Sequence, residues 1–266
     1  MPARAITITS GKGGVGKTTL TANLAVALAM RGQRVVAIDT DIGLRNLDVV
    51  MGLENRIVYD LVDVIEGTCR LRQAMIRDKH LNELYLLPAA QKRDKMAVSP
   101  DDMRGLVEQL RDGFDFILLD SPAGIERGFQ NALAGAAEVI IVTTPEVSAV
   151  RDADRIIGLV EAAEKGPPKL VINRIRPTMV RQGDMLSTED VLEILAISLL
   201  GIVPDDEAII VSTNRGVPAA YDHRSLAGIA FHNIARRIMG ENVPLLTIGE
   251  RPGGVLERIK SWFRAG

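Results

Sequence analysis

The sequence contains a single cysteine, Cys69, among its 266 residues. One thiol excludes a disulfide framework or a cluster of thiolate metal ligands within one chain, and sparse cysteine is typical of a reducing cytoplasm. No apolar run approaches the roughly 18 uninterrupted residues of a membrane-spanning helix. The first residues lack a long apolar core, so we expect no signal peptide. These absences favour a cytoplasmic protein that is soluble unless a peripheral element anchors it.

The sequence also lacks a strong charge of either sign, because its formal net charge is −2. A near-neutral chain gives no general reason to expect nucleic-acid binding, so any basic surface has to be local. Hydrophobic residues make up 47% of the chain and charged residues 25%, as in ordinary globular proteins. The length and the even composition predict one large α/β domain.

Short apolar segments alternate with longer helical patterns along the chain. Apolar segments with little polar alternation are typical of strands buried on both faces of a parallel sheet. The alternation predicts a doubly wound α/β fold, a mostly parallel sheet with helices on both faces. The expected strands are 5–9, 34–39, 84–88, 115–120, 138–143, 169–173 and 199–203. The expected helices are 17–30, 100–111, 148–163, 188–198 and 226–239. The helix 188–198 is expected to have Ser187 or Thr188 as its N-cap.

The segment SGKGGVGKTT, residues 10–19, contains the phosphate-binding pattern G-x-x-x-x-G-K-[ST] between an expected strand and an expected helix. Glycines let backbone N–H groups face an anion, and the helix start adds unpaired amides and a positive dipole end. Lys17 is expected to neutralise β- and γ-phosphate charge, and the Thr18 hydroxyl to bind Mg²⁺. The residues expected to bind the nucleotide here are Gly11, Lys12, Gly13, Gly14, Val15, Gly16, Lys17, Thr18 and Thr19.

Three aspartates follow expected strands. Asp120 ends the apolar segment FILLD, which has the Walker B form and predicts a carboxylate that holds Mg²⁺ through water. Asp39 and Asp41 lie at the carboxyl end of the second strand, and residues two apart in an extended segment point the same way. One of the two is expected to assist the metal and the other to orient the attacking water. The sequence leaves open which of the three aspartates orients the water.

The phosphate loop carries an extra lysine, Lys12, directly after its first glycine. In this respect K-G-G-x-G-K-[ST], residues 12–18, resembles the deviant Walker A motif of the ParA/MinD family of P-loop ATPases. The resemblance implies an ATP-dependent homodimer in which Lys12 reaches the partner's phosphates, much as an arginine finger does. A cation delivered only on dimerisation would couple Mg²⁺-dependent ATP hydrolysis to assembly. Lys12, Lys17, Asp41 and Asp120 are therefore the expected catalytic residues, with Thr18, Asp39 and Asp120 at the metal.

The resemblance extends through most of the chain, in blocks such as LLPAAQKRDK, DSPAGIE and GDMLSTEDVLEIL. These blocks are similar to the family's division-site proteins. The single cysteine argues against two other branches, the nitrogenase iron protein and the arsenite pump, which need more thiols. The resemblance implies recruitment of the division inhibitor MinC to the membrane, and activation by MinE or another topological factor.

The same resemblance implies further contact residues. Asn173, Pro204 and Asp205 would meet adenine. Asn46 lies in switch I beside the water-activating Asp41. The helix from Ser148, with Asp152 and Asp154, is similar to the surface that MinC and MinE use, although a charged helix face often only meets solvent.

The C-terminal tail VLERIKSWFRAG follows the breaker-rich segment GERPGG. We expect an ATPase domain over 1–248, a flexible linker over 249–254 and an amphipathic membrane-targeting helix over 255–266. A short basic helix with aromatic residues is typical of a membrane-surface element that binds anionic lipid, while a helix docked on the body is the alternative. Its apolar face contains Val255, Leu256, Ile259, Trp262 and Phe263.

Two other functions stay open from the sequence. A partition-type ATPase of the same family would bind DNA through a salt-sensitive basic patch on the folded body. The tail instead favours a protein that is peripheral on the cytoplasmic face of the cell membrane. A flagellar-number regulator of the same family is compatible with such a tail.

Overall fold

The structure, a computed structural model, describes residues 3–246. The expected linker at 249–254 and the expected membrane helix at 255–266 lie outside the described residues, so those two predictions stay predictions. None of the helices in the described part combines the length and apolarity needed to span a bilayer.

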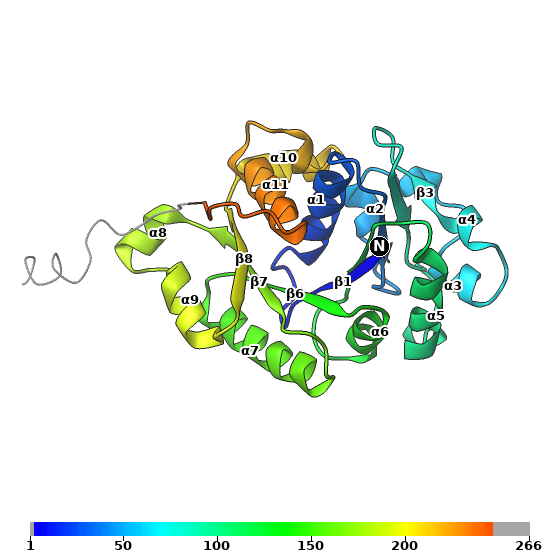
Figure 1. Ribbon diagram of the computed structural model, residues 1–266, viewed down its shortest axis with the longest axis horizontal. Helices are drawn as coiled ribbons and strands as arrows, with labels where there is room; N and C mark the ends of the chain where they lie inside the picture. The colour runs from blue at the N-terminus through cyan, green and yellow to red at the C-terminus, as the bar shows by residue number, and fades with distance from the viewer. Residues whose placement is uncertain (1–2, 247–266) are drawn as a thin grey trace, which may run out of the picture.

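One eight-stranded sheet, in the order β3-β4-β2-β5-β1-β6-β7-β8, forms the centre of the protein (Figure 1). Every pairing is parallel except that of β3 with β4, so the expected mostly parallel sheet is confirmed. The strands are β1 Arg4–Thr9, β2 Val35–Asp39, β3 Ile76–Arg77, β4 Leu84–Leu87, β5 Phe116–Asp120, β6 Glu138–Thr143, β7 Lys169–Ile175 and β8 Ser198–Pro204.

Helices cover both faces of the sheet (Figure 1). Helices α1 and α11 pack on one face, and α5, α6, α7 and α9 pack on the other. The α-helices are α1 Lys17–Ala29, α2 Leu47–Val50, α3 Leu61–Ile65, α4 Leu71–Ala74, α5 Pro100–Leu110, α6 Arg127–Gly135, α7 Val147–Ala162, α8 Pro177–Gln182, α9 Thr188–Leu195, α10 Glu207–Asn214 and α11 Leu226–Ile238. Short 3₁₀ turns are η1 Glu54–Arg56, η2 Lys95–Ala97 and η3 Ala219–Tyr221.

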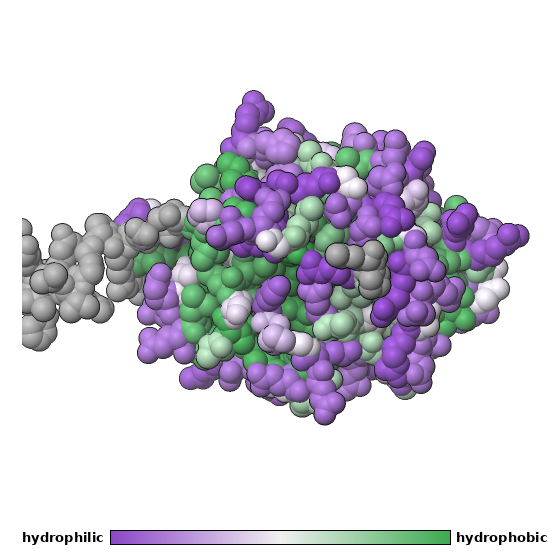
Figure 2. Space-filling model, in the orientation of Figure 1, coloured by the Kyte–Doolittle hydropathy of each residue, from purple (hydrophilic) through white to green (hydrophobic). Residues whose placement is uncertain are grey.

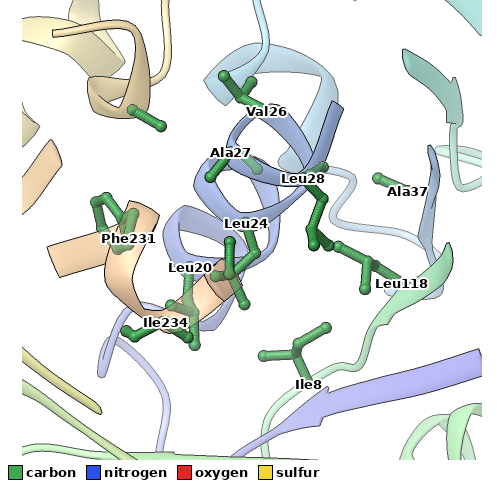
Figure 3. Packing of buried hydrophobic residues seen from close by; sticks show 14 of the residues in the cluster. Ile8, Leu20, Leu24, Val26, Ala27, Leu28, Ala37, Leu118, Phe231 and Ile234 are labelled. Atoms are coloured by element: carbon green, nitrogen blue, oxygen red, sulfur yellow. The ribbon is translucent and has the colours of Figure 1, made fainter. Parts of the chain in front are cut away.

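Helix α1 is buried between the sheet and α11, which explains why its residues from Ala22 to Ala29 are apolar apart from Asn23. Figure 3 shows Leu20 and Leu24 of α1 near Ile234 of α11, with Ile8 of β1 and Leu118 of β5 on the sheet side. All five side chains are at most 2% exposed. A helix packed this tightly gives the phosphate loop at its N-terminus a rigid support.

The expected helix 188–198 is wrong at its C-terminal end. Helix α9 stops at Leu195 because Ala196 adopts a left-handed conformation with φ 51°, and β8 begins at Ser198. Its start is confirmed with Ser187 as the N-cap, because the Ser187 hydroxyl accepts from Asp190 N. Sequence reasoning also missed β3 and the helices α2, α3, α4, α6, α8 and α10. Strand β3 has only two residues, too few to show periodicity.

The described chain ends beside β8, the edge strand of the sheet. The Arg237 guanidinium donates to Leu200 O of β8 at 3.0 Å and to Val243 O at 2.9 Å, which holds the segment after α11 against that edge. On the face in Figure 2, hydrophobic residues (green) gather around the region of β8, and hydrophilic residues (purple) cover much of the remainder.

Candidate functional site

The phosphate loop connects β1 to α1, as the sequence predicts, and two of its glycines are conformationally required. Gly14 and Gly16 have φ values of 79° and 98°, in the left-handed region that favours glycine. A Cβ on Gly16 would also lie 2.3 Å from Nδ2 of Asn173. The loop thus adopts a glycine-dependent conformation at the N-terminus of α1, a fit for an anionic ligand.

The two lysines of the loop have opposite surroundings. Lys17 is 7% exposed, and its ammonium donates to the Ser10 hydroxyl at 2.9 Å. Burial lowers the pKa of Lys17, while the charges of Asp120 and Asp41 oppose that change. A buried ammonium group close to carboxylates is placed to neutralise phosphate charge.

The Lys12 side chain instead contacts the residues at the start of α7. Its ammonium is 3.3 Å from a carboxylate oxygen of Glu146 and donates to the Ser148 hydroxyl at 3.0 Å. The Lys12 side chain is 41% exposed and that of Glu146 57%, and exposed pairs of this kind contribute little, about 0–1 kcal/mol. Lys12 is therefore held within its own chain by a contact that is easily broken.

Asp39 and Asp120 are brought together by the register of the sheet. They are direct partners at the carboxyl ends of the parallel strands β2 and β5, and both are at most 2% exposed. Burial raises the pKa of Asp120 to about 7, and the nearby charge of Asp39 adds to this effect. Burial likewise raises the pKa of Asp39 to about 6. Two buried carboxylates side by side are a natural site for a cation.

The residues around Asp120 fit Mg²⁺ bound to a phosphate. The hydroxyl groups of Thr18 and Thr21 both donate hydrogen bonds to the Asp120 carboxylate. The described residues contain no group of three His, Cys, Asp or Glu side chains able to hold a metal. Mg²⁺ commonly binds through one or two carboxylates plus substrate phosphates.

Asp39 also shapes the loop after β2. Its carboxylate accepts hydrogen bonds from the backbone N–H groups of Asp41 at 2.9 Å, Asn46 at 3.0 Å and Leu47 at 3.1 Å. This arrangement fixes the loop and leaves Asp41 near enough to Lys17 to attract its charge. Asn46 is exposed and forms the N-cap position of α2. The metal role predicted for Asp39 stays a prediction, and its contacts here are with the backbone.

The residues predicted to meet adenine lie at the ends of β7 and β8. The Asn173 side chain is buried and donates to Val15 O in the phosphate loop at 2.7 Å. Pro204 is buried at the end of β8, and the exposed Asp205 accepts from Arg176 Nε at 2.5 Å. Asn173 thus positions the phosphate loop, while the adenine contacts stay predictions.

The partner surface predicted on α7 adjoins the phosphate loop. A Cβ on Gly11 would lie 2.3 Å from the backbone oxygen of Asp152, so α7 and the loop are in close contact. Asp154 is exposed on the same helix. Sequence reasoning missed Ser10, Thr21 and Glu146. Ser10 could have been found from the sequence, because it directly precedes the loop. Glu146 could not, because only the tertiary fold brings it to Lys12.

Comparisons with known proteins agree with this geometry. Residues 6–219 match the CobQ/CobB/MinD/ParA nucleotide binding domain. The chain is 56% identical to the septum site-determining protein MinD of Bacillus subtilis (strain 168), over 97% of each chain. It is 55% identical to the protein of that name from Synechocystis sp., over 99% of each. The chain belongs to the MinD family.

Solved MinD structures have the same fold. The MinC:MinD cell division protein complex of Aquifex aeolicus includes a chain with a TM-score of 0.86 and 48% identity, covering 93% of this chain and 100% of that one. MinD of Pyrococcus horikoshii OT3, complexed with Mg-ADP, has a TM-score of 0.80 and 32% identity, covering 89% and 96%. The sequence-based family assignment and the P-loop fold are confirmed.

Proposed function

We propose that this protein is a Mg²⁺-dependent ATPase that dimerises on ATP, binds the cytoplasmic face of the cell membrane as a dimer, and helps to place the division site by recruiting MinC. The observation that carries the proposal is the separation of the two lysines. Lys17 is buried in the loop among acids, whereas Lys12 is exposed beside α7. Only the exposed lysine is placed to serve a second chain.

The chemistry assigns separate tasks to the residues of the site. The bound nucleotide and Mg²⁺ would supply the reacting phosphoryl group and its charge neutralisation. Lys17 and the loop amides would bind the β- and γ-phosphates, and Thr18 and Asp120 would hold the cation. Asp41 would orient the attacking water. Lys12 of a second copy would add positive charge where the transition state is negative.

Membrane binding by the tail would depend on dimerisation, because the free energy that one tail gains at the membrane is close to the cost of ordering it. Burial of a large apolar side chain such as Trp262 contributes roughly 1.5–3 kcal/mol, and each cation near anionic lipid about 1 kcal/mol. Ordering the backbone costs on the order of 1–2 kcal/mol per residue, so one tail is marginal. Two tails on one dimer would raise the avidity by roughly 10²–10⁴. Hydrolysis would separate the dimer and release it.

Recruitment of MinC and activation by MinE or another topological factor are supported by the family relationship. The MinC:MinD complex of Aquifex aeolicus includes a chain that aligns with 93% of this one. Ser148 and Asp152 adjoin the phosphate loop at the start of α7, so a partner bound there would sense the nucleotide state through Lys12.

Co-sedimentation with anionic vesicles and with DNA, with ATP or ADP, tests the proposal. We expect ATP-dependent pelleting with vesicles, its loss in Trp262→Glu, and intact ATP-driven dimers in that variant. A variant that still pelleted would refute the assignment of the membrane face. ATP-dependent DNA binding that survived deletion of residues 255–266 would favour a partition-type function instead.

A further inference from the structure

The turn after β2 contains a residue in a strained backbone conformation. Arg45 has a φ of 37°, in the left-handed region that residues other than glycine seldom adopt. Its backbone N–H donates to Asp41 O at 3.2 Å, which closes the turn. The next two N–H groups, those of Asn46 and Leu47, then donate to the Asp39 carboxylate. The strained residue therefore lies where the chain changes direction between Asp41 and α2.

The Arg45 side chain pairs with a buried carboxylate. Its Nε lies 2.9 Å from Oδ2 of Asp48 in α2, and the two side chains are 15% and 1% exposed. Nε has no hydrogen-bond partner among the described residues, so the contact is mainly electrostatic. Burial raises the pKa of Asp48, and the charge of Arg45 opposes that rise. Because solvent screens buried charges weakly, the pair ties the turn firmly to α2.

This ion pair explains how the strained conformation of Arg45 is maintained. A residue keeps an unfavourable φ only where the surrounding structure holds it there. Without the ion pair the side chain would be released and φ could relax, which would move Asp41 through the backbone hydrogen bond. In the present conformation the charge of Asp41 opposes the lowering of the Lys17 pKa. The turn thus already holds Asp41 near the phosphate loop.

We propose that Arg45 is a positioning residue, whose ion pair with Asp48 holds the turn in the conformation that directs Asp41 at the bound nucleotide. The inference rests on the proposed function, in which Asp41 orients the attacking water. Arg45 makes no contact with the phosphate loop in this role. Loss of the pair therefore lowers the rate of ATP hydrolysis and leaves the affinity for ATP unchanged.

Amide hydrogen exchange of the nucleotide-free full chain, followed by NMR, tests the positioning step without any activity. In Arg45→Gly, glycine adopts the left-handed conformation without strain but lacks the ion pair. We expect the Asn46 and Leu47 amides to exchange about tenfold faster than in the wild type. The Val62 amide, which donates to Asp60 in a separate turn, should exchange as before. Unchanged exchange at Asn46 and Leu47 would overturn the proposal.

Single-turnover ATP hydrolysis tests the consequence for Asp41. Arg45→Gly and Asp48→Asn should each lower the rate by about tenfold or more, with the Kd for ATP changed by less than about twofold. The double variant should be no slower than the slower single variant, because both changes remove the same pair. Arg45→Lys keeps a cation within reach of Asp48 and should retain most of the rate. In an Asp41→Asn background, Arg45→Gly should cause no further loss.

A matched control separates the ion pair from the effect of a new glycine. Glu164, which follows α7, is exposed and also has a left-handed φ, of 53°. Glu164→Gly should leave the rate of hydrolysis unchanged, and an equal loss there would overturn the proposal. Asp48→Asn leaves the Arg45 charge buried without its counterion, which lowers stability. Arg45→Gly has no such charge and keeps the test valid if Asp48→Asn fails to fold.

Other outcomes would also overturn the proposal. They are losses that multiply in the double variant, a further loss when Arg45→Gly is added to Asp41→Asn, and an absence of ATP-driven dimers of Arg45→Gly in light scattering. A wild type without ATPase activity, or an Asp41→Asn variant with the wild-type rate, would instead refute the proposed function. The hydrogen-exchange result is independent of both.

Discussion

The substitution Asp120→Asn should change how the stability of the nucleotide-free protein depends on pH. Asp120 is 2% exposed, and burial raises its pKa to about 7 from an ordinary value of 3.8. Between these values the unfolded chain loses the Asp120 proton and the folded protein keeps it. Because the unfolded state then binds fewer protons, the free energy of unfolding falls as pH rises from about 4 to 7.

The size of the effect follows from the pKa difference. A difference of about three, from 7 minus 3.8, corresponds to roughly 4 kcal/mol. Asp39 acts in the same direction, because its pKa is raised to about 6. Asparagine keeps the shape of the side chain without the charge, so Asp120→Asn should be more stable than the wild type at pH 8 and similar to it near pH 4.

Urea unfolding followed by circular dichroism at pH 5 and pH 8, without nucleotide, measures this difference. Comparison with the wild type removes the contribution of other groups, and Asp101→Asn is a control at an exposed carboxylate. Mg²⁺ and ATP should stabilise the wild type more than the variant. An Asp120→Asn variant with the wild-type pH dependence would show that this carboxylate does not carry the buried charge.

Three more predictions follow from the loop and from α11. Gly16→Ala should destabilise the protein by about 1–3 kcal/mol in urea unfolding and abolish nucleotide binding, because φ is 98° and the new Cβ meets Asn173. Gly13→Ala, whose Cβ would lie 3.9 Å from its nearest neighbour, should fold normally, and equal stability of the two variants would contradict this. Lys12→Ala should keep stability and nucleotide binding but lose ATP-driven dimers, which normal dimers in light scattering would refute. Burial lowers the pKa of His232, so the unfolded chain binds a proton at a higher pH than the folded protein does. Lowering the pH below 6.5 should therefore destabilise the wild type more than His232→Gln. Parallel pH profiles of the two proteins would contradict this.

Much of the site could be predicted from the sequence because its signals are local. The phosphate loop needs a strand, a set of glycines and a helix start in immediate succession, and residues 4–29 provide all three. The strand ends at Asp39 and Asp120 were readable as apolar runs that stop at a carboxylate. A doubly wound fold places the carboxyl ends of its parallel strands at one edge, so these parts were expected to meet.

Other features depended on contacts between distant segments. The pairing of Lys12 with Glu146 joins residues 134 positions apart, and no local pattern marks Glu146. Asn173 was predicted as an adenine contact, yet its amide holds the phosphate loop at Val15. Helices α6 and α10 escaped prediction although both have eight or nine residues.

The sequence by itself determined which chemical groups are available and the order in which strands and helices carry them. Only the tertiary structure decided their environment: which lysine is buried and which is exposed, which carboxylates are buried side by side, and which arginine pairs with a buried carboxylate. The physical reason is that local pattern fixes backbone geometry over a few residues, whereas desolvation and pairing depend on every segment that packs nearby.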